Sequence, residues 1–323
     1  MAQAIPSLII MLVIFSSLSS ITLAEPQDNG RLAMPKQISG NASKSFNAPG
    51  YARLISQDRL KAAQLQYESS QQKASEARKK LATNRAAVKE LSEKAAKSCW
   101  AWSLSRCARA KSEIDEKARE TLSAAASAAI EDLTKAATKA DQSDDLTDEE
   151  AEQVKSPLNR SAEAITSIRE SIENKEGKAP NYFMLAKQLN IEIASSNRQI
   201  QISHEKISIA QLTAAISLTK SLGPRLRSVI FSASKEGKNV KAISDMTDQM
   251  AGIIETASKK ADEAGSALDS GDLETGRAKS KEAKSRLSRS HDLVKEIYKE
   301  LKSLGLDKEL AKTDLLSNPR LNI

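Results

Sequence analysis

Long stretches without glycine or proline constrain this chain more than any other feature of its sequence. Neither residue occurs from Tyr51 to Lys97 or from Asn181 to Leu222. The 323 residues include only 11 Gly and 8 Pro, which is below the roughly 7% and 5% of an average protein. A chain so short of turn residues must form long, uninterrupted elements, and these are expected to be helices.

The composition points the same way. Charged residues make up 28% of the chain and aromatic residues only 3%, and Ala, Ser, Lys, Glu and Leu are abundant. This mixture favours helix and disfavours a β sandwich or barrel. The chain has no glycine-rich phosphate loop and no series of buried Val/Ile strands, so an α/β enzyme is not expected. We predict an all-α fold, an elongated antiparallel helical bundle or coiled coil with a disordered N-terminal leader.

The charge is mildly basic, with 49 Lys and Arg against 42 Asp and Glu and a formal net charge of +7. Both signs are mixed along most of the chain, whereas nucleic-acid binders concentrate basic residues on one face and interleave aromatic residues. We therefore interpret the charges as solvation of helix surfaces and expect no specific nucleic-acid partner. Attraction to an anionic partner is the alternative.

The N-terminus resembles an export signal. It is apolar from Ile5 to Leu23 apart from one Pro and several Ser and Thr, and Thr22-Leu23-Ala24 offers a cleavage site before Glu25. Against this, the first four residues lack the usual Lys or Arg. A retained membrane anchor is the alternative, since about 20 apolar residues cross a bilayer. We predict a signal peptide at 1–24 and an extracytoplasmic protein, periplasmic or secreted.

The mature chain divides by its composition. Pro, Gly, Asn and Ser dominate residues 25–50, which we expect to be a flexible leader. Residues 51–140 are predicted to form a long helical hairpin, 141–152 an acidic linker and 153–323 a helical bundle. Within the hairpin, the Ala-rich stretch from Leu122 to Ala129 would let a neighbouring helix approach closely.

The acidic linker has seven Asp and Glu and no Lys or Arg from Asp141 to Glu152. Thr147 and Glu150 have the spacing of a capping box, which predicts that a helix starts at Asp148 with its carboxylates at the positive end of the dipole. A calcium loop is the alternative. The run lacks the central Gly and alternating ligands of an EF-hand.

Further helix boundaries follow from Pro and Gly. Ser156-Pro157 predicts a helix start, and Gly223-Pro224 predicts a helix stop. Ser270-Gly271-Asp272 predicts a tight break between two further helices. Two isoleucine series repeat every seven residues on nearly opposite sides of the helix that contains residues 181–222, so we expect this helix at the centre of the bundle. The two series are Ile193, Ile200 and Ile207, and Ile202, Ile209 and Ile216.

Cys99 and Cys107 are the only cysteines. In one continuous helix they would lie about 12 Å apart, beyond the roughly 7 Å limit between α-carbons for a disulfide. We predict a disulfide in the oxidising compartment, with the intervening residues forming a loop that turns one helix back on the next. Two unpaired thiols on one long helix are the alternative.

Trp100 and Trp102, the only tryptophans, lie between the two cysteines. With Leu104 they could anchor a protein partner or touch a membrane interface peripherally. The alternative is that the indoles cover the open end of the bundle.

Few other residues suggest chemistry. His204 and His291 lie in polar stretches, and each is expected to be exposed or partly packed. No catalytic group, metal site or cofactor site can be assembled, so we expect no enzyme and no cofactor. Asn41 and Asn159 each begin a glycosylation sequon, which makes them candidate sites if the source organism glycosylates exported proteins.

These features predict an exported, non-enzymatic scaffold, adaptor or surface-binding component that acts through a protein partner. Because coiled-coil surfaces often self-associate, a homo-oligomer is included in this expectation. The alternative is a membrane-active helical protein, similar to pore-forming helical toxins. Its insertion segment would be Ile207 to Ala233, although Lys220, Arg225 and Arg227 make insertion costly.

Overall fold

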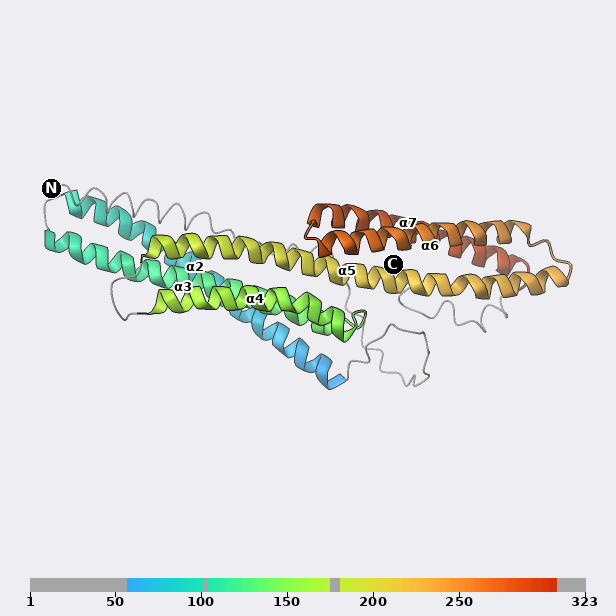
Figure 1. The fold of residues 1–323 in the computed structure, drawn as a ribbon, viewed down its shortest axis with the longest axis horizontal. Coiled ribbons are helices and arrows are strands. Elements are labelled where there is room, and N and C mark those ends of the chain that lie inside the picture. The colour runs from blue at the N-terminus through green and yellow to red at the C-terminus, as the bar shows by residue number, and fades with distance from the viewer. Residues whose placement is uncertain (1–56, 101–103, 175–180, 307–323) are drawn as a thin grey trace. The chain divides into compact units, whose positions relative to one another are not determined.

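The computed structural model describes residues 57–100, 104–174 and 181–306. The predicted signal peptide, the leader and Asn41 therefore lie outside the described residues. Within the described part every regular element is a helix, which confirms the all-α helical bundle (Figure 1). The helices are α2 (Gln57–Trp100), α3 (Leu104–Gln142), α4 (Asp148–Glu173), α5 (Tyr182–Lys235), α6 (Lys241–Asp269) and α7 (Leu273–Ser303).

The chain forms two compact units that meet within α5, between Ser203 and His204. The first unit contains α2, α3, α4 and the N-terminal part of α5, and the second contains the rest of α5 with α6 and α7. Each unit has its own hydrophobic core. One helix therefore supplies residues to both cores.

In the first unit, α2 and α3 pack against each other as a coiled-coil pair. Ala74, Leu81, Val88 and Ala95 of α2 recur every seven residues and all are buried. That repeat keeps one stripe of α2 against its partner over many turns. Across the pair, Arg78 donates to Asp132 over 2.6 Å.

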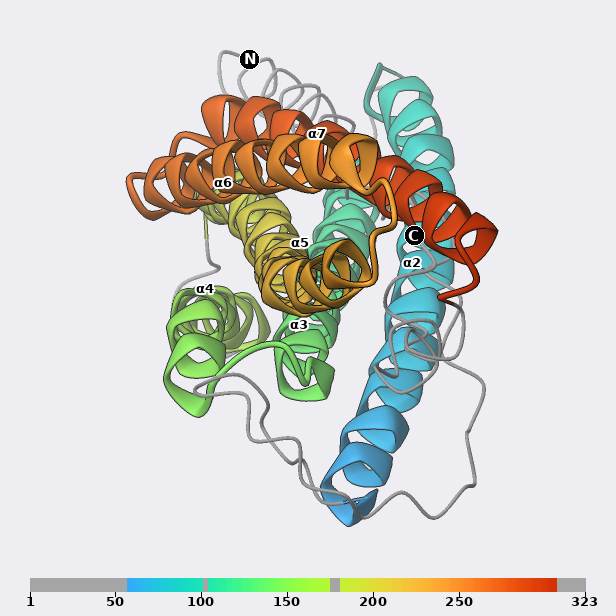
Figure 2. The same cartoon turned by 90° about the vertical axis from the view of Figure 1, so that its right-hand side faces the viewer.

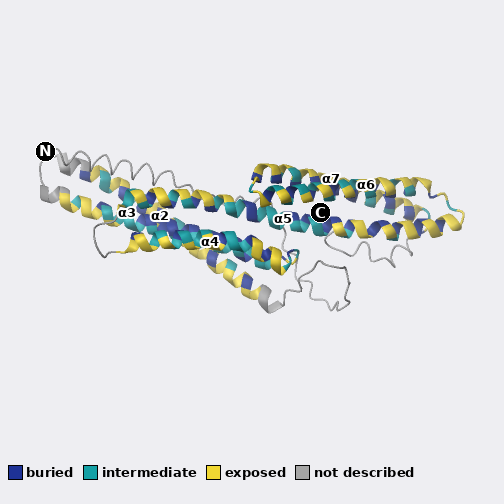
Figure 3. Cartoon of the chain, in the orientation of Figure 1, coloured by how far each residue is buried: buried dark blue, intermediate teal, exposed yellow. Residues whose placement is uncertain are grey.

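The centre of the first unit is α3, while in α5 none of the six isoleucines of the two predicted series is exposed. No residue of α3 from Lys117 to Gln142 is exposed, as the buried and intermediate colours of α3 indicate (Figure 3). By contrast, Met184 and Ile191 of α5 are exposed. The predicted Ala-rich stretch explains this, because its alanines are all buried and their short side chains let neighbours approach from several sides. The core around α3 includes Leu81 from α2, Ile165 from α4 and Leu189 from α5, among others.

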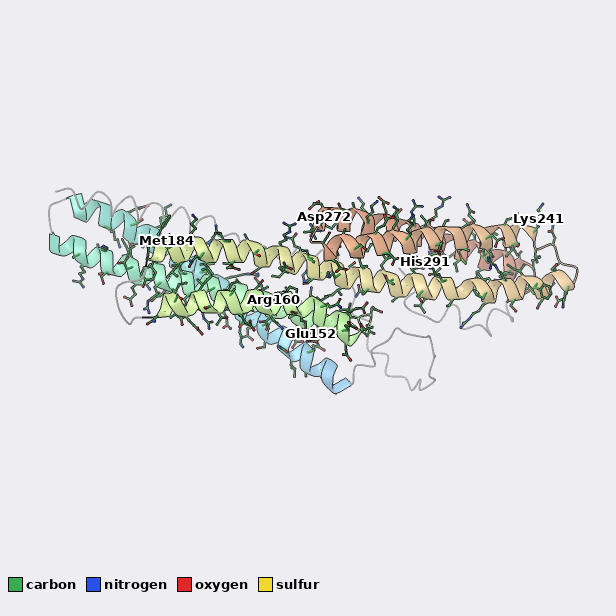
Figure 4. The ribbon with its side chains drawn as sticks, viewed as in Figure 1. Glu152, Arg160, Met184, Lys241, Asp272 and His291 are labelled. Carbon is green, nitrogen blue, oxygen red and sulfur yellow. The ribbon has the colours of Figure 1, made fainter. Side chains whose placement is uncertain are left out.

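The second unit is a three-helix bundle in which α6 and α7 lie side by side in both views (Figures 1 and 2). Ile216 of α5, Ile254 of α6 and Leu287 of α7 belong to one of its core clusters. The predicted break at Ser270–Asp272 joins α6 to α7. Gly271 has φ +82° there, a conformation that favours glycine, and Asp272 caps α7 by accepting from the Thr275 backbone N–H at 3.1 Å (Figure 4).

Both proline-based boundaries were wrong. Pro157 lies inside α4, and α5 continues through Gly223-Pro224 to Lys235. A proline in a helix interior costs about 3 kcal/mol, but burial of one large apolar side chain contributes about 1.5–3 kcal/mol. Leu222, Leu226, Val229 and Ile230 are all buried around Pro224, so continued packing outweighs the lost hydrogen bond.

Helices α6 and α7 approach each other closely at Gly276. A Cβ atom there would contact Leu268 Cδ2 and lie 2.7 Å from Leu268 Cγ, and Leu268 is itself buried. We expect Gly276→Ala to destabilise the protein by about 1–2 kcal/mol, because overpacking exceeds the gain in helix propensity.

Gly252→Ala is the matched control for this variant. Nothing lies within 4 Å of a Cβ atom at Gly252, an exposed position of α6, so the same change should stabilise by about 0.5–1 kcal/mol. Urea unfolding of both variants checks this pair. Equal effects of one sign would show that α6 and α7 do not meet at Gly276.

Candidate binding surfaces

The end of the α2–α3 hairpin carries the residues predicted to contact a partner. Helix α2 ends at Trp100 and α3 begins at Leu104. The side chains of Trp100, Trp102 and Leu104, like those of Cys99 and Cys107, lie outside the described residues. Because α2 and α3 pack against each other, the alternative of one long continuous helix is wrong. The disulfide and the role of the tryptophans remain predictions.

Described charges next to this end are exposed. Arg109 and Lys111 lie on the surface of α3, and Arg109 pairs with Glu113 over 3.3 Å. Lys94 of α2 pairs with Glu90. Exposed pairs of this kind contribute roughly 0–1 kcal/mol each to folding stability. These charges therefore serve mainly to keep the helix surfaces solvated.

The acidic connection between α3 and α4 is anchored by two buried residues, Ser143 and Leu146. Helix α4 begins at Asp148, where the capping-box spacing predicted it. Lys155 lies 3.1 Å from a carboxylate oxygen of both Asp141 and Glu152, the residues at the two ends of the acidic run (Glu152 is labelled in Figure 4). The exposed carboxylates between them are Asp144, Asp148, Glu149 and Glu150.

Within the described residues, which include the whole acidic connection, no three His, Cys, Asp or Glu side chains form a group that could hold a metal ion.

Ion pairs connect the helices at two interfaces within the second unit. Between α5 and α6, Lys206 pairs with Asp269 and Arg227 pairs with Asp248. Between α6 and α7, Glu263 lies 3.2 Å from Lys279 and also pairs with Lys260 on its own helix. Each basic residue here lies beside a carboxylate.

The middle of α7 differs from these interfaces because it has an excess of basic residues. Six Lys and Arg and a single carboxylate, Glu282, occur from Arg277 to Arg289. Four of the basic residues are fully on the surface, and no carboxylate of the described chain pairs with them. They are Lys281, Lys284, Arg286 and Arg289, here called the α7 basic face. Mixed charge over the whole chain hides this run, although the run is visible in a local window of the sequence.

A buried polar pair lies in the core of the second unit. His291, expected to be exposed or partly packed, is only 5% exposed (Figure 4). Its Nε2 atom lies 3.2 Å from Thr219 Oγ1, and the Thr219 hydroxyl donates to the Ala215 carbonyl at 2.9 Å. Thr219 therefore accepts from His291, which places the proton of the neutral ring on Nε2. His204 is partly buried.

Burial lowers the pKa of His291, and nearby Lys295 lowers it further, while Asp292 opposes both. The folded protein therefore favours the neutral form of the His291 ring. Nδ1 has no hydrogen-bond partner among the described residues, which is consistent with a deprotonated nitrogen at that position.

Asn159, a candidate glycosylation site, is exposed in the middle of α4. Its neighbour in sequence, Arg160, is labelled in Figure 4. Asn159 lines a shallow, open depression on one side of that helix. The other lining residues are Ala162, Glu163, Thr166, Ser167 and Glu170.

None of the described helices combines the length and the apolar character needed to cross a bilayer. No protein-family model, no curated protein and no solved structure matches the chain.

The predicted disulfide can be tested by alkylation and mass spectrometry of the protein isolated without reductant. We expect Cys99 and Cys107 to resist alkylation until a reductant is added, because sulfur atoms joined in a disulfide have no free thiolate to react. Cys99→Ser should then destabilise the protein by about 2.5 kcal/mol on the loop-entropy model. Labelling of both thiols without reductant would contradict the pairing.

The buried histidine predicts a pH dependence of stability. Since the pKa of His291 is lower in the folded state than in the unfolded chain, its contribution is complete above the unfolded value of about 6.5. That contribution to stability is lost as the pH falls from about 6.5 through the pKa of His291 in the folded state. Urea unfolding from pH 8 to pH 5 should show this loss.

His291→Gln keeps a side-chain N–H for Thr219 and removes the titration, so this part of the pH dependence should disappear. His204→Gln is the control and should leave it in place. An unchanged pH profile in His291→Gln would refute the assignment.

Proposed function

We propose that this chain is an exported, non-enzymatic scaffold or adaptor that presents helix surfaces to protein partners. In this proposal the signal peptide at 1–24 directs it to the periplasm or the cell exterior. Binding surfaces, and not a reaction centre, carry its function.

The observation that supports the proposal most is the shared helix α5. Ile193 of α5 is buried in the core of the first unit, and Leu226 of the same helix is buried in the core of the second. Two bundles are thus joined through a packed helix instead of a loop. A chain built in this way can hold two separate surfaces on one molecule, as a scaffold requires.

The two surfaces differ in chemistry. The first unit contributes the hairpin end with Trp100, Trp102 and Leu104, and tryptophan is among the residue types that dominate binding energy at protein interfaces. The second unit contributes the α7 basic face. An apolar contact and an ionic contact on separate units suit two different partners.

The membrane-active alternative would require residues 207–233 to leave their core. Leu212, Ile216, Leu222 and Leu226 from this segment are buried, and Lys220 within it pairs with Glu255 at 3.2 Å. A liposome leakage assay separates the two functions. Dye release at any lipid composition would favour the membrane-active protein.

The proposal predicts a product that begins at Glu25 and is found outside the cytoplasm. N-terminal sequencing of the protein from fractionated cells measures both properties. An uncleaved, cytosolic product would reject the export proposal.

The partner surface is tested by proximity labelling followed by pull-down. We expect Trp100→Ala/Trp102→Ala to lower partner capture by tenfold or more, since interface tryptophans typically contribute 2 kcal/mol or more. Leu65→Ala, at a side chain of α2 that is 68% exposed, is the matched control and should not change capture. Full capture by the tryptophan variant would remove the hairpin end from the proposal.

A further inference from the structure

The charges of α7 are sorted onto separate sides of the helix. At about 100° per residue, five of its lysines lie within one arc of about 60°, here called the α7 lysine stripe. They are Lys281, Lys284, Lys295, Lys299 and Lys302. Arg277 and Ser288 are the other two residues of α7 on this arc, so it contains neither an acidic nor an apolar residue. Arg286 and Arg289 of the α7 basic face lie on other sides of the helix.

The carboxylates of α7 occupy the side next to the stripe. At the same rotation per residue, all five lie within an arc of about 80° that does not overlap the arc of the lysines. They are Glu274, Glu282, Asp292, Glu296 and Glu300. The stripe is therefore a continuous basic surface along one side of α7.

The lysines of the stripe are all exposed and have few partners in the second unit. Lys295 pairs with Asp292 at 3.6 Å, and Lys284 donates to the neutral Ser208 Oγ at 2.9 Å. The remaining three lysines have no ion pair or hydrogen bond among the described residues. Folding of this unit therefore leaves most of the charge of the stripe uncompensated.

The helices packed against α7 supply little opposite charge to the stripe. Helix α5 lies on this side, where Glu205 pairs with Arg277 at 3.2 Å, but α5 has no Asp or Glu from Lys206 to Lys235. Helix α6 meets α7 on roughly the opposite side, where Glu263 lies 3.2 Å from Lys279. The anion that complements the stripe must therefore come from outside this unit.

The spacing of the stripe indicates an extended partner. Lys281 and Lys302 are 21 positions apart, so the stripe runs for about 32 Å along one uninterrupted helix. Lysines three or four positions apart on one helix repel each other, and an external anion removes that repulsion. A straight row of cations can meet a flat sheet of anions along its whole length.

The chemistry of the stripe also favours such a surface. A lysine ammonium is a hydrated point charge without the fork that arginine uses for bidentate recognition. Among the described residues, none of the large exposed hydrophobic side chains belongs to α7. The stripe thus has neither an apolar anchor for a protein partner nor an aromatic platform for nucleic-acid bases.

We propose that the α7 lysine stripe holds the second unit against a membrane surface that contains anionic lipids. The contact is peripheral, because the stripe has no apolar side chain to enter the bilayer. Each lysine close to such a surface strengthens binding about fivefold, and salt screens the attraction. This contact goes beyond the proposed function and requires neither export nor a partner at the hairpin end.

Co-sedimentation with vesicles tests the proposal. The chain that begins at Glu25 is used, so that the apolar segment at 5–23 makes no contribution. It should bind vesicles of equimolar phosphatidylglycerol and phosphatidylcholine at low salt, lose them at high salt, and not bind pure phosphatidylcholine. The vesicles should retain an enclosed dye, because the protein stays on their surface.

The variant K281Q/K299Q/K302Q neutralises the three lysines without partners. It should lower the vesicle partition coefficient about a hundredfold, at about fivefold for each lysine. K281R/K299R/K302R keeps the charge and should keep the binding. Circular dichroism confirms that each variant is folded.

The matched control is K259Q/R286Q/R289Q. It removes the same charge from exposed positions of the second unit that lie outside the stripe. Its partition coefficient should fall by less than about fivefold, the effect of one lysine at the surface. Trp100→Ala/Trp102→Ala should bind vesicles like the wild type, which separates this contact from the partner surface at the hairpin end.

Three results would overturn the proposal. The first is a wild type that does not bind the phosphatidylglycerol vesicles at low salt. The second is an equal loss of binding in the stripe variant and in its matched control. The third is binding of heparin or duplex DNA through the stripe without binding of vesicles, which would identify a soluble polyanion as the partner.

Discussion

Close packing of small side chains is the constraint on which the structure depends. The core of the first unit contains many alanines, among them Ala125, Ala126 and Ala128, all fully buried. An alanine buries little apolar area, so each contact contributes little free energy, and stability must come from many contacts in series. This explains why α2 has 44 residues and α3 has 39, well beyond the mean helix length of about 11–12.

Small residues also decide which helices can meet. Gly276 brings α7 against Leu268 of α6 at the hairpin, and the buried alanines of α3 allow neighbours on several sides. Larger side chains then fill the remaining space, with Leu133 in α3 and Ile172 in α4 fully buried. Glycine and alanine thus let the helices approach closely, and leucine and isoleucine fill the space between them.

The sequence was sufficient for the fold class and for breaks with strong local chemistry. Gly271 needs a positive φ, and Asp148 starts a helix at an acidic run, so both boundaries follow from a few neighbouring residues. The boundaries predicted at Pro157 and Pro224 were wrong because apolar residues next to each proline are buried against residues distant in sequence. The burial of His291 was not predicted because its serine neighbours are polar. They are nevertheless small enough to be buried, as Ser290 is. The α7 basic face was readable from the sequence only in a local window, while its lack of carboxylate partners required the structure.

The sharing of α5 has a consequence for how the protein unfolds. Starting a helix is unfavourable, and adding residues to an existing one is not, so the two cores use a single nucleation event in α5. Loss of one core leaves its stretch of α5 without tertiary support and frays the helix toward the other core. Melting of the two units is therefore thermodynamically coupled through α5, although each unit has a separate hydrophobic interior.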